Sequence, residues 1–313
     1  MLKEIRKLCI KLLIIIGGVI LISAIGLVIY YPNIMKTNNA AYVDKAQRIE
    51  SLDSPKAVFV GGSATAFGIH AEQFQVATGM ESVNMGMNAG VSFRMYIETI
   101  LPNIKQGDVV FLTPEYSYYP LDYNGIEEND IFMICYFRPQ LLKTLSIGDV
   151  PNFMKAAIST GLQNWSNLTN ETIRDIVFGE GYGVYYRTNL NEYGDFIGQK
   201  GLESKQFASL PMEHRMNNFV PNLDCAIGLM EEKGAKVYVL FPPYADTEYA
   251  QNEQFIDQIR QALSQAEHVE LLFEPTDSEY PVSSFFDTVY HLTWEAAQQH
   301  TDMIIDRYQK AAK

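Results

Sequence analysis

Three polar residues near the two ends of the chain have the side chains that hydroxyl-based acyl transfer requires. Ser63 follows an apolar segment and two glycines, in the order Val-Phe-Val-Gly-Gly-Ser. Asp287 and His291 stand four residues apart, just before a predicted helix near the other end. In this chemistry the serine hydroxyl is the nucleophile, the imidazole takes its proton, and the carboxylate orients the imidazole. The fold must bring the two ends together for such a site to exist.

Each of these motifs also has an interpretation that involves no chemistry. A serine after a strand and two glycines is often only the N-cap of the next helix. An Asp and a His before a helix are often a surface carboxylate and a half-buried imidazole. Gly62 permits a sharp turn and a close approach of substrate, but no Gly-Lys-Ser/Thr follows, which disfavours a phosphate loop. Both interpretations of Ser63, Asp287 and His291 stay open at this point.

The glycine-rich turn at residues 84–90 is a candidate source of oxyanion donors. It follows the second predicted strand and reads Asn-Met-Gly-Met-Asn-Ala-Gly. The N–H groups of Gly86 and Gly90, or the side-chain amide of Asn88, can stabilise a tetrahedral oxyanion if they face the same pocket as Ser63. The alternative is an ordinary glycine-rich turn.

Glu115 follows the third predicted strand, in the order Thr-Pro-Glu-Tyr. It is expected either to orient substrate or to accept hydrogen bonds from the Ser63 loop as a scaffold, and the second role is favoured. The loop at 116–119, which contains three tyrosines, and the loop at 187–195 are candidate substrate-facing loops of the cap. Such loops can bind sugars, but more often they fill the core of their own domain.

Short apolar strands alternate with helices outside the middle of the chain. This order predicts an α/β fold with a parallel sheet covered on both faces. The predicted strands are 56–60, 82–85, 108–112, 236–241 and 269–273, and the predicted helices are 71–79, 92–104, 246–266 and a last helix that Thr293 caps.

This alternation stops between about residues 116 and 215. The stretch is rich in Tyr, Asn and Gly, and helices are predicted at 138–146, 150–160 and 168–178. An insertion after a central strand is expected to form a cap over the carboxyl edge of the sheet, where α/β proteins build ligand sites.

The N-terminal region predicts a membrane anchor. Residues 12–31 form an uncharged run of 20 residues, which is long enough to cross a bilayer as a helix. Four cations precede this run, so the N-terminus is expected in the cytoplasm and the rest of the chain outside. A cleaved signal peptide is the alternative, but its apolar region is usually shorter. Residues 1–31 are thus expected to be a tail and anchor, 32–54 a stalk and 55–313 the catalytic domain.

Charge and cysteine content exclude several classes of protein. The net charge is −13, which disfavours a nucleic-acid binder. The three cysteines, Cys9, Cys135 and Cys225, do not form the pattern of a disulfide framework or a zinc site. Neither a metal nor a diffusible cofactor is expected.

Taken together, the motifs resemble those of the SGNH (GDSL-type) hydrolase superfamily. Gly61-Gly62-Ser63 resembles the family's first block, and residues 84–90 resemble its second. Asp287 and His291 resemble its last block, with one more residue between them than usual. The usual asparagine donor of the third block is absent from Thr113-Pro114-Glu115-Tyr116, so Asn88 is expected to replace it. The resemblance covers about residues 55–115 and 235–311.

This resemblance implies a three-layer, flavodoxin-like sheet of about five strands, with Ser63, Asp287 and His291 as catalytic residues. The departures from the family pattern are similar to those of the teichoic-acid D-alanyl transfer proteins and of polysaccharide O-acetylation proteins. Proteins of those families are anchored by one N-terminal helix and work with a multi-span membrane O-acyltransferase. The expected function is therefore a membrane-anchored, extracellular serine acyltransferase or esterase that acts on cell-envelope polysaccharide or teichoic acid. The alternatives are a non-catalytic carbohydrate-binding or scaffold protein and a simple hydrolase without a partner.

Overall fold

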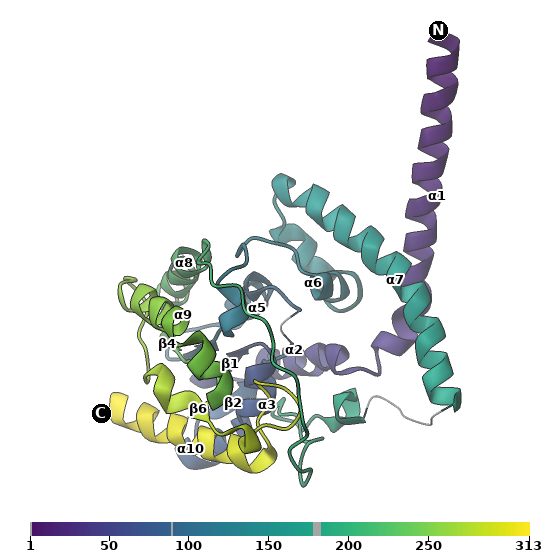
Figure 1. Cartoon of the computed structure of the whole chain (residues 1–313). Helices are drawn as coiled ribbons and strands as arrows, with labels where there is room; N and C mark the ends of the chain where they lie inside the picture. Colours follow the sequence, from purple (N-terminus) through teal and green to yellow (C-terminus); the bar gives the residue numbers. More distant parts are fainter. Residues whose placement is uncertain (1, 89, 178–182) are drawn as a thin grey trace.

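A four-stranded parallel sheet forms the centre of the protein, in a computed structural model that describes residues 2–88, 90–177 and 183–313. The strand order is β2–β1–β3–β4 (Figure 1). All residues of β1 and β3 are buried, as expected for central strands that are covered on both faces. The predicted α/β class with a parallel sheet is confirmed. The strands are β1 (Lys56–Gly61), β2 (Glu81–Asn84), β3 (Val109–Thr113) and β4 (Lys236–Val239).

The fifth predicted strand, at residues 269–273, does not form. This segment makes one isolated parallel bridge, between Leu271 and Val239 of β4. The five-stranded sheet of the prediction is thus four strands with a flanking bridge. A separate parallel pair is formed by β5 (Tyr244–Ala245) and β6 (Glu279–Tyr280).

The helices beside the sheet lie mostly where the sequence predicts them. The helix α4 (Ala71–Thr78) ends at Gly79, whose φ of 74° is the left-handed conformation that closes many helices. The helix α10 (Trp294–Ala311) begins after Thr293, whose hydroxyl accepts the N–H of Ala296. The others are α5 (Phe93–Ile100), α9 (Asp246–Ser264) and α8 (Phe219–Glu231), of which α8 was not predicted.

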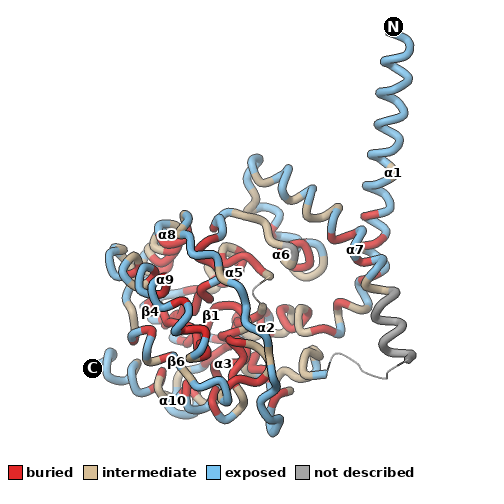
Figure 2. Tube along the Cα trace, viewed as in Figure 1, coloured by how far each residue is buried: buried red, intermediate tan, exposed pale blue. Residues whose placement is uncertain are grey.

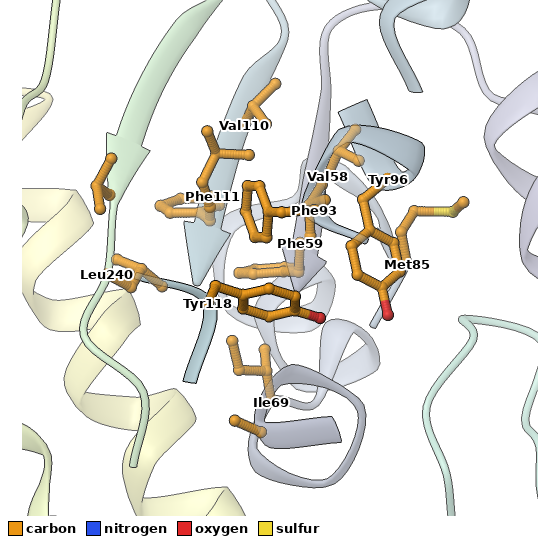
Figure 3. Close-up of a cluster of buried hydrophobic side chains, with 14 of the residues drawn as sticks. Val58, Phe59, Ile69, Met85, Phe93, Tyr96, Val110, Phe111, Tyr118 and Leu240 are labelled. Carbon is orange, nitrogen blue, oxygen red and sulfur yellow. The ribbon is translucent and has the colours of Figure 1, made fainter. Parts of the chain in front are cut away.

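Aromatic rings on neighbouring strands fill one face of the sheet. Phe59 pairs with Phe111 in the register of β1 and β3, and Phe111 pairs with Tyr238 of β4. The rings of Phe59 and Phe111 stack with their centroids 4.8 Å apart (Figure 3). Phe74 of α4 and Tyr308 of α10 pack against Phe111. These contacts fix α4 and α10 on this face of the sheet.

The segment predicted as a stalk, residues 32–54, packs against the main body instead. The helix α2 (Ala41–Ser51) buries Tyr42, Ala46 and Ile49 in the hydrophobic core. An apolar face of this size is stable only against a partner surface, so α2 is part of the domain and not a free spacer.

Lys45 of α2 is completely buried. Its Nζ donates a hydrogen bond to the carbonyl of Gly86 and lies 5.0 Å from the centre of the Phe196 ring. Burial disfavours the charged ammonium and outweighs the nearby charges of Asp195 and Asp44. The pKa of Lys45 is therefore lowered to about 7.

The helices of the cap differ from those predicted. The two predicted at 150–160 and 168–178 are one continuous helix, α7 (Val150–Val177), because no proline interrupts this stretch after Pro151. Residue 178 itself lies outside the described residues. The segment predicted as a helix at 138–146 is a 3₁₀ helix over Pro139–Thr144, and the short helix α6 (Glu128–Phe132) precedes it.

The cap loop that begins at Arg187 and ends at Asp195 is docked on the main body. The Arg187 guanidinium donates two hydrogen bonds to the carboxylate of Asp44, at 2.7 and 2.8 Å. The Asp195 carboxylate accepts the N–H groups of Ala71 and Glu72 at the start of α4, at 2.8 and 3.1 Å. This loop therefore serves as packing and not as a substrate-facing surface.

The first helix, α1 (Leu2–Ile34), is long and apolar enough to cross a membrane. Its N-terminal part extends away from the rest of the protein and is exposed along its length (Figures 1 and 2). Near its C-terminal end α1 crosses α7, and the two helices make close contact there. The three cysteines are all unpaired and exposed.

Candidate active site

Ser63 and Glu115 meet because β1 and β3 are neighbours in the sheet. Gly61 and Thr113 are opposite each other at the carboxyl ends of these strands, and each polar residue follows two positions later. Ser63 is the first residue of the short helix α3 (Ser63–Gly68) and is half-buried. Its Oγ donates to Glu115 Oε1 at 3.2 Å, and the N–H of Ala64 donates to the same oxygen at 2.8 Å.

Gly62 leaves the space that the Glu115 carboxylate fills. A Cβ atom at residue 62 would lie 2.5 Å from Glu115 Oε1, closer than any real contact allows. Burial raises the pKa of Glu115, and the hydrogen bonds from Ala64 and Ser63 together with the nearby imidazole of His291 oppose that rise. The geometry places Glu115 as a buried support for the Ser63 loop.

His291 and Asp287 form a hydrogen-bonded pair on a tight loop before α10. His291 Nδ1 lies 2.9 Å from Asp287 Oδ1. The loop is closed by the N–H of Phe286, which donates to the carbonyl of His291 at 2.7 Å, and by the hydroxyl of Thr288, which accepts the N–H of His291. With Nδ1 held by the carboxylate, Nε2 is the nitrogen that remains for proton transfer.

The helix α3 holds the imidazole as well as the serine. The ring of Phe67, one helical turn after Ser63, stacks on the ring of His291 with centroids 4.5 Å apart. The two ends of the chain are therefore connected through one short helix, which the sequence did not indicate.

Tyr185 completes this group and was missed by the sequence analysis. Its hydroxyl donates to Asp287 Oδ2 at 2.6 Å and lies 3.2 Å from His291 Nδ1. Burial alone would raise the pKa of Asp287, but hydrogen bonds from His291 and Tyr185 and the charge of Lys205 outweigh it, so this pKa is lowered. No spacing rule pointed to Tyr185, because it comes from the cap.

A pocket of about 400 Å³ opens beside these groups. Ser63, Glu115 and His291 all line it, together with apolar and aromatic side chains from the cap and the sheet. Within the described part of the chain, the hydroxyl of Ser63 is bonded to Glu115 and not to His291. The apolar lining residues include Leu121, Leu210, Pro211, Met212, Tyr244 and Tyr290.

The predicted donors of the 84–90 turn lie elsewhere. The N–H of Gly86 donates to Asn84 Oδ1 and that of Gly90 to Asn88 Oδ1, both at 2.9 Å. The side-chain amide of Asn88 is bonded to Asn39 and Asn129. Ala89 lies outside the described residues. Gly86, Asn88 and Gly90 are not among the residues that line the pocket, because their polar groups hold the turn together.

Two other histidines, His70 and His300, are also buried. The ring of His70 packs on Trp294, with centroids 4.0 Å apart, and burial lowers its pKa. His300 is fully buried beside the hydroxyl of Tyr280, and burial lowers its pKa to about 3. Neither residue lines the pocket. Among the residues that the structure describes, no group of three His, Cys, Asp or Glu side chains is placed to hold a metal ion.

Fold and pocket together define an α/β protein with a serine hydroxyl and an imidazole–carboxylate pair in one cavity. No protein-family model matches the chain, and no curated protein matches it. Among the solved structures that match is a Streptococcus pneumoniae protein provisionally described as a platelet activating factor; the match covers 90% of this chain and 98% of that one. The identity is 13% and the TM-score is 0.37, a similarity too low to bear on fold or function.

Replacing Glu115 with alanine is expected to destabilise the protein. The change leaves the N–H of Ala64 without a partner in a buried position, which costs about 1–3 kcal/mol of unfolding free energy. Glu115→Gln keeps an acceptor and should stay close to the wild type. Thermal unfolding of the full chain in a nonionic detergent measures both. Glu213→Ala removes an exposed carboxylate of the same pocket and is the control; an equal stability of Glu115→Ala and Glu213→Ala would contradict the supporting role.

Proposed function

We propose that this protein is a membrane-anchored serine acyltransferase or esterase. The observation that supports the proposal is that Ser63 and His291 line the same pocket, with His291 hydrogen-bonded to Asp287. A hydroxyl nucleophile, a base and a carboxylate that orients the base are the parts that acyl transfer through serine needs.

The proposed reaction has two halves. His291 Nε2 takes the proton of Ser63 as Oγ attacks the carbonyl carbon of an acyl ester, and the tetrahedral intermediate collapses to acyl-serine. The proton passes from His291 to the departing alcohol. A second hydroxyl, from water or from a polymer, then attacks the acyl-serine in the same way and releases Ser63. Since the 84–90 turn is engaged elsewhere, donors close to Ser63 itself must stabilise the oxyanion.

The proposed acceptor or donor of the acyl group is a cell-envelope polysaccharide or teichoic acid on the outer side of the membrane. This part of the proposal rests on the α1 anchor, with its positive charges before the apolar run, and on the family resemblance of the motifs. A multi-span membrane O-acyltransferase is the proposed partner that would supply acyl groups.

A fluorophosphonate probe tests the nucleophile. After labelling of the full-length protein, mass spectrometry of the peptides should locate the adduct on Ser63. Ser117 lines the same pocket and is exposed, so it is an internal control for reactivity caused by access alone. An adduct on Ser117, or none at all, would count against the proposal. With Ser63 labelled, rapid turnover of p-nitrophenyl acetate would favour an esterase, and slow turnover a transferase.

A non-catalytic, carbohydrate-binding protein is the second candidate. It is favoured by one observation: the hydroxyl of Ser63 donates to Glu115 and makes no hydrogen bond with His291. In that case polysaccharide binding would be unchanged in Ser63→Ala and in His291→Ala, and the fluorophosphonate adduct would be absent.

A further inference from the structure

The cap helix α7 contacts α1 at a depth that lies within the bilayer. Lys11 is the last charged residue before the apolar run, so the hydrocarbon core begins after it. A core about 30 Å thick takes about 20 helical residues at 1.5 Å each, which places its outer boundary near Tyr31. Any tilt of the helix moves that boundary further along the chain. Ile22, Ser23 and Gly26 are thus inside the hydrocarbon region.

All three residues contact α7. Ser23 Oγ is 3.1 Å from the carbonyl oxygen of Ala157 and 3.0 Å from that of Ile158. Trp165 Nε1 donates to the carbonyl of Ile22 at 3.1 Å. Such hydrogen bonds and small residues are typical of helix pairs in membranes.

Two glycines bring the backbones of the helices together. A Cβ atom at Gly26 would lie 1.9 Å from the carbonyl oxygen of Gly161, and one at Gly161 would lie 2.2 Å from Ser23 Oγ. The crossing is therefore a close backbone contact, and the middle of α7 has to lie at the same depth as this part of α1.

The surface of α7 is apolar on the side that meets α1. Val150 and Met154 are 49% and 41% exposed, and they lie on the same helical face as Gly161 and Trp165. Just before α7, Ile147 is 92% exposed. In water this exposed apolar surface has no favourable partner.

The opposite face of α7 is polar. Lys155 and Ser159 line a second cavity, of about 430 Å³, together with Asp122 and Glu127 of the cap. A helix with one apolar and one polar face is the type that lies in the plane of a membrane surface.

The arrangement of the molecule is compatible with that position. The domain with the central sheet lies to one side of α1, and α7 runs obliquely from that side across α1 (Figure 1). A bilayer that covers the apolar face of α7 and leaves this domain in water requires α1 to be tilted from the bilayer normal, as membrane helices usually are.

We propose that α7 lies in the outer leaflet, with phospholipid acyl chains against its apolar face. The protein is then held at the membrane by two elements, one that crosses the bilayer and one that lies in it. This inference rests on α1 crossing the membrane, but it does not depend on the chemistry of Ser63.

The two tryptophans of the chain allow a direct test. Trp165 is on α7, whereas Trp294 is on α10 in the catalytic domain. Trp294→Phe and Trp165→Phe each leave one reporter in the full-length protein, which is reconstituted into phosphatidylcholine vesicles with or without brominated acyl chains. Bromine quenches an indole that it touches, so the emission of Trp165 should fall in the brominated vesicles if α7 lies at the acyl boundary. The emission of Trp294 should not change.

A second pair of variants tests the part of α7 that does not touch α1. In a protein with both Trp165→Phe and Trp294→Phe, Met154→Trp puts a reporter on the apolar face and Asn152→Trp puts one on the polar face. Brominated lipid should quench the first and spare the second. Both positions are exposed, so the fold should tolerate the changes, and thermal unfolding checks this.

The proposal fails if Trp165 and the reporter at residue 154 are not quenched while α1 resists extraction by alkaline carbonate. That result would mean that acyl chains do not contact the apolar face of α7 and that a protein partner covers it instead. Equal quenching of the reporters at residues 152 and 154 would also overturn it, since α7 would then have no fixed orientation in the leaflet.

Discussion

Replacing His291 with alanine is expected to slow fluorophosphonate labelling of Ser63 by about 10²–10⁴-fold, the usual contribution of a general base. The imidazole is 7% exposed, is stacked on Phe67 and is held through Nδ1 by Asp287. Once it is removed, the group that accepts the Ser63 hydroxyl in the described structure is Glu115, whose Oε1 also accepts the N–H of Ala64.

A matched control exists elsewhere in the protein. His268 Nδ1 lies 2.8 Å from Glu231 Oε2, so it is also a histidine paired with a carboxylate, but it is not a lining residue of the pocket. In His268→Ala, the fluorophosphonate probe should label Ser63 at the wild-type rate. Unchanged labelling of His291→Ala would show that His291 is not the base and would move this role to Glu115.

Stability is expected to rise with pH above neutrality because of Lys45. Its pKa is about 7 in the folded protein and about 10.5 in the unfolded chain. Between these values the unfolded state binds the additional proton, so the unfolding free energy increases by up to about 1.4 kcal/mol per pH unit. Below pH 7 both states are protonated, and the full cost of a buried ammonium is present.

The measurement compares wild type with Lys45→Met in a nonionic detergent, by chemical unfolding at pH 7, 8 and 9. The rise of unfolding free energy with pH that Lys45 causes should be present only in the wild type. Tyrosines and cysteines that titrate in the same pH range are common to both proteins, so the difference between the two profiles isolates the effect of Lys45. Lys233→Met removes an exposed lysine and should leave the slope unchanged. Parallel pH profiles of wild type and Lys45→Met would contradict a lowered pKa.

The regular part of the fold was predictable because its signals are local. The strands β1 and β3 are continuous apolar segments, and Gly79 and Thr293 are helix end signals whose geometry the structure shows directly. The absent fifth strand and the burial of α2 depend on distant partners: Val239 of β4 for the single bridge at Leu271, and the core residues around Tyr42 for α2. Tertiary contacts of that kind leave no periodic pattern in the segment itself.

The part of the candidate site that was predictable is the part that follows from which strands are neighbours in the sheet. Glu115 reaches Ser63 because both follow adjacent parallel strands. The same logic failed for Asn88, since the turn after β2 satisfies its own polar groups. Tyr185 was not predictable, because its position is set by docking of the cap and not by any neighbour in the sequence.

The hydroxyl of Tyr185 also makes the cap and the imidazole energetically interdependent. The loop that follows Tyr185 is held on the main body by the hydrogen bonds of Arg187 with Asp44 and of Asp195 with the start of α4. Any event that breaks these hydrogen bonds would withdraw the Tyr185 hydroxyl from Asp287. Any ligand that strengthens the Asp287–His291 pair would in return stabilise the docked loop. Release of a ligand from the pocket and detachment of the loop would then be coupled in one equilibrium.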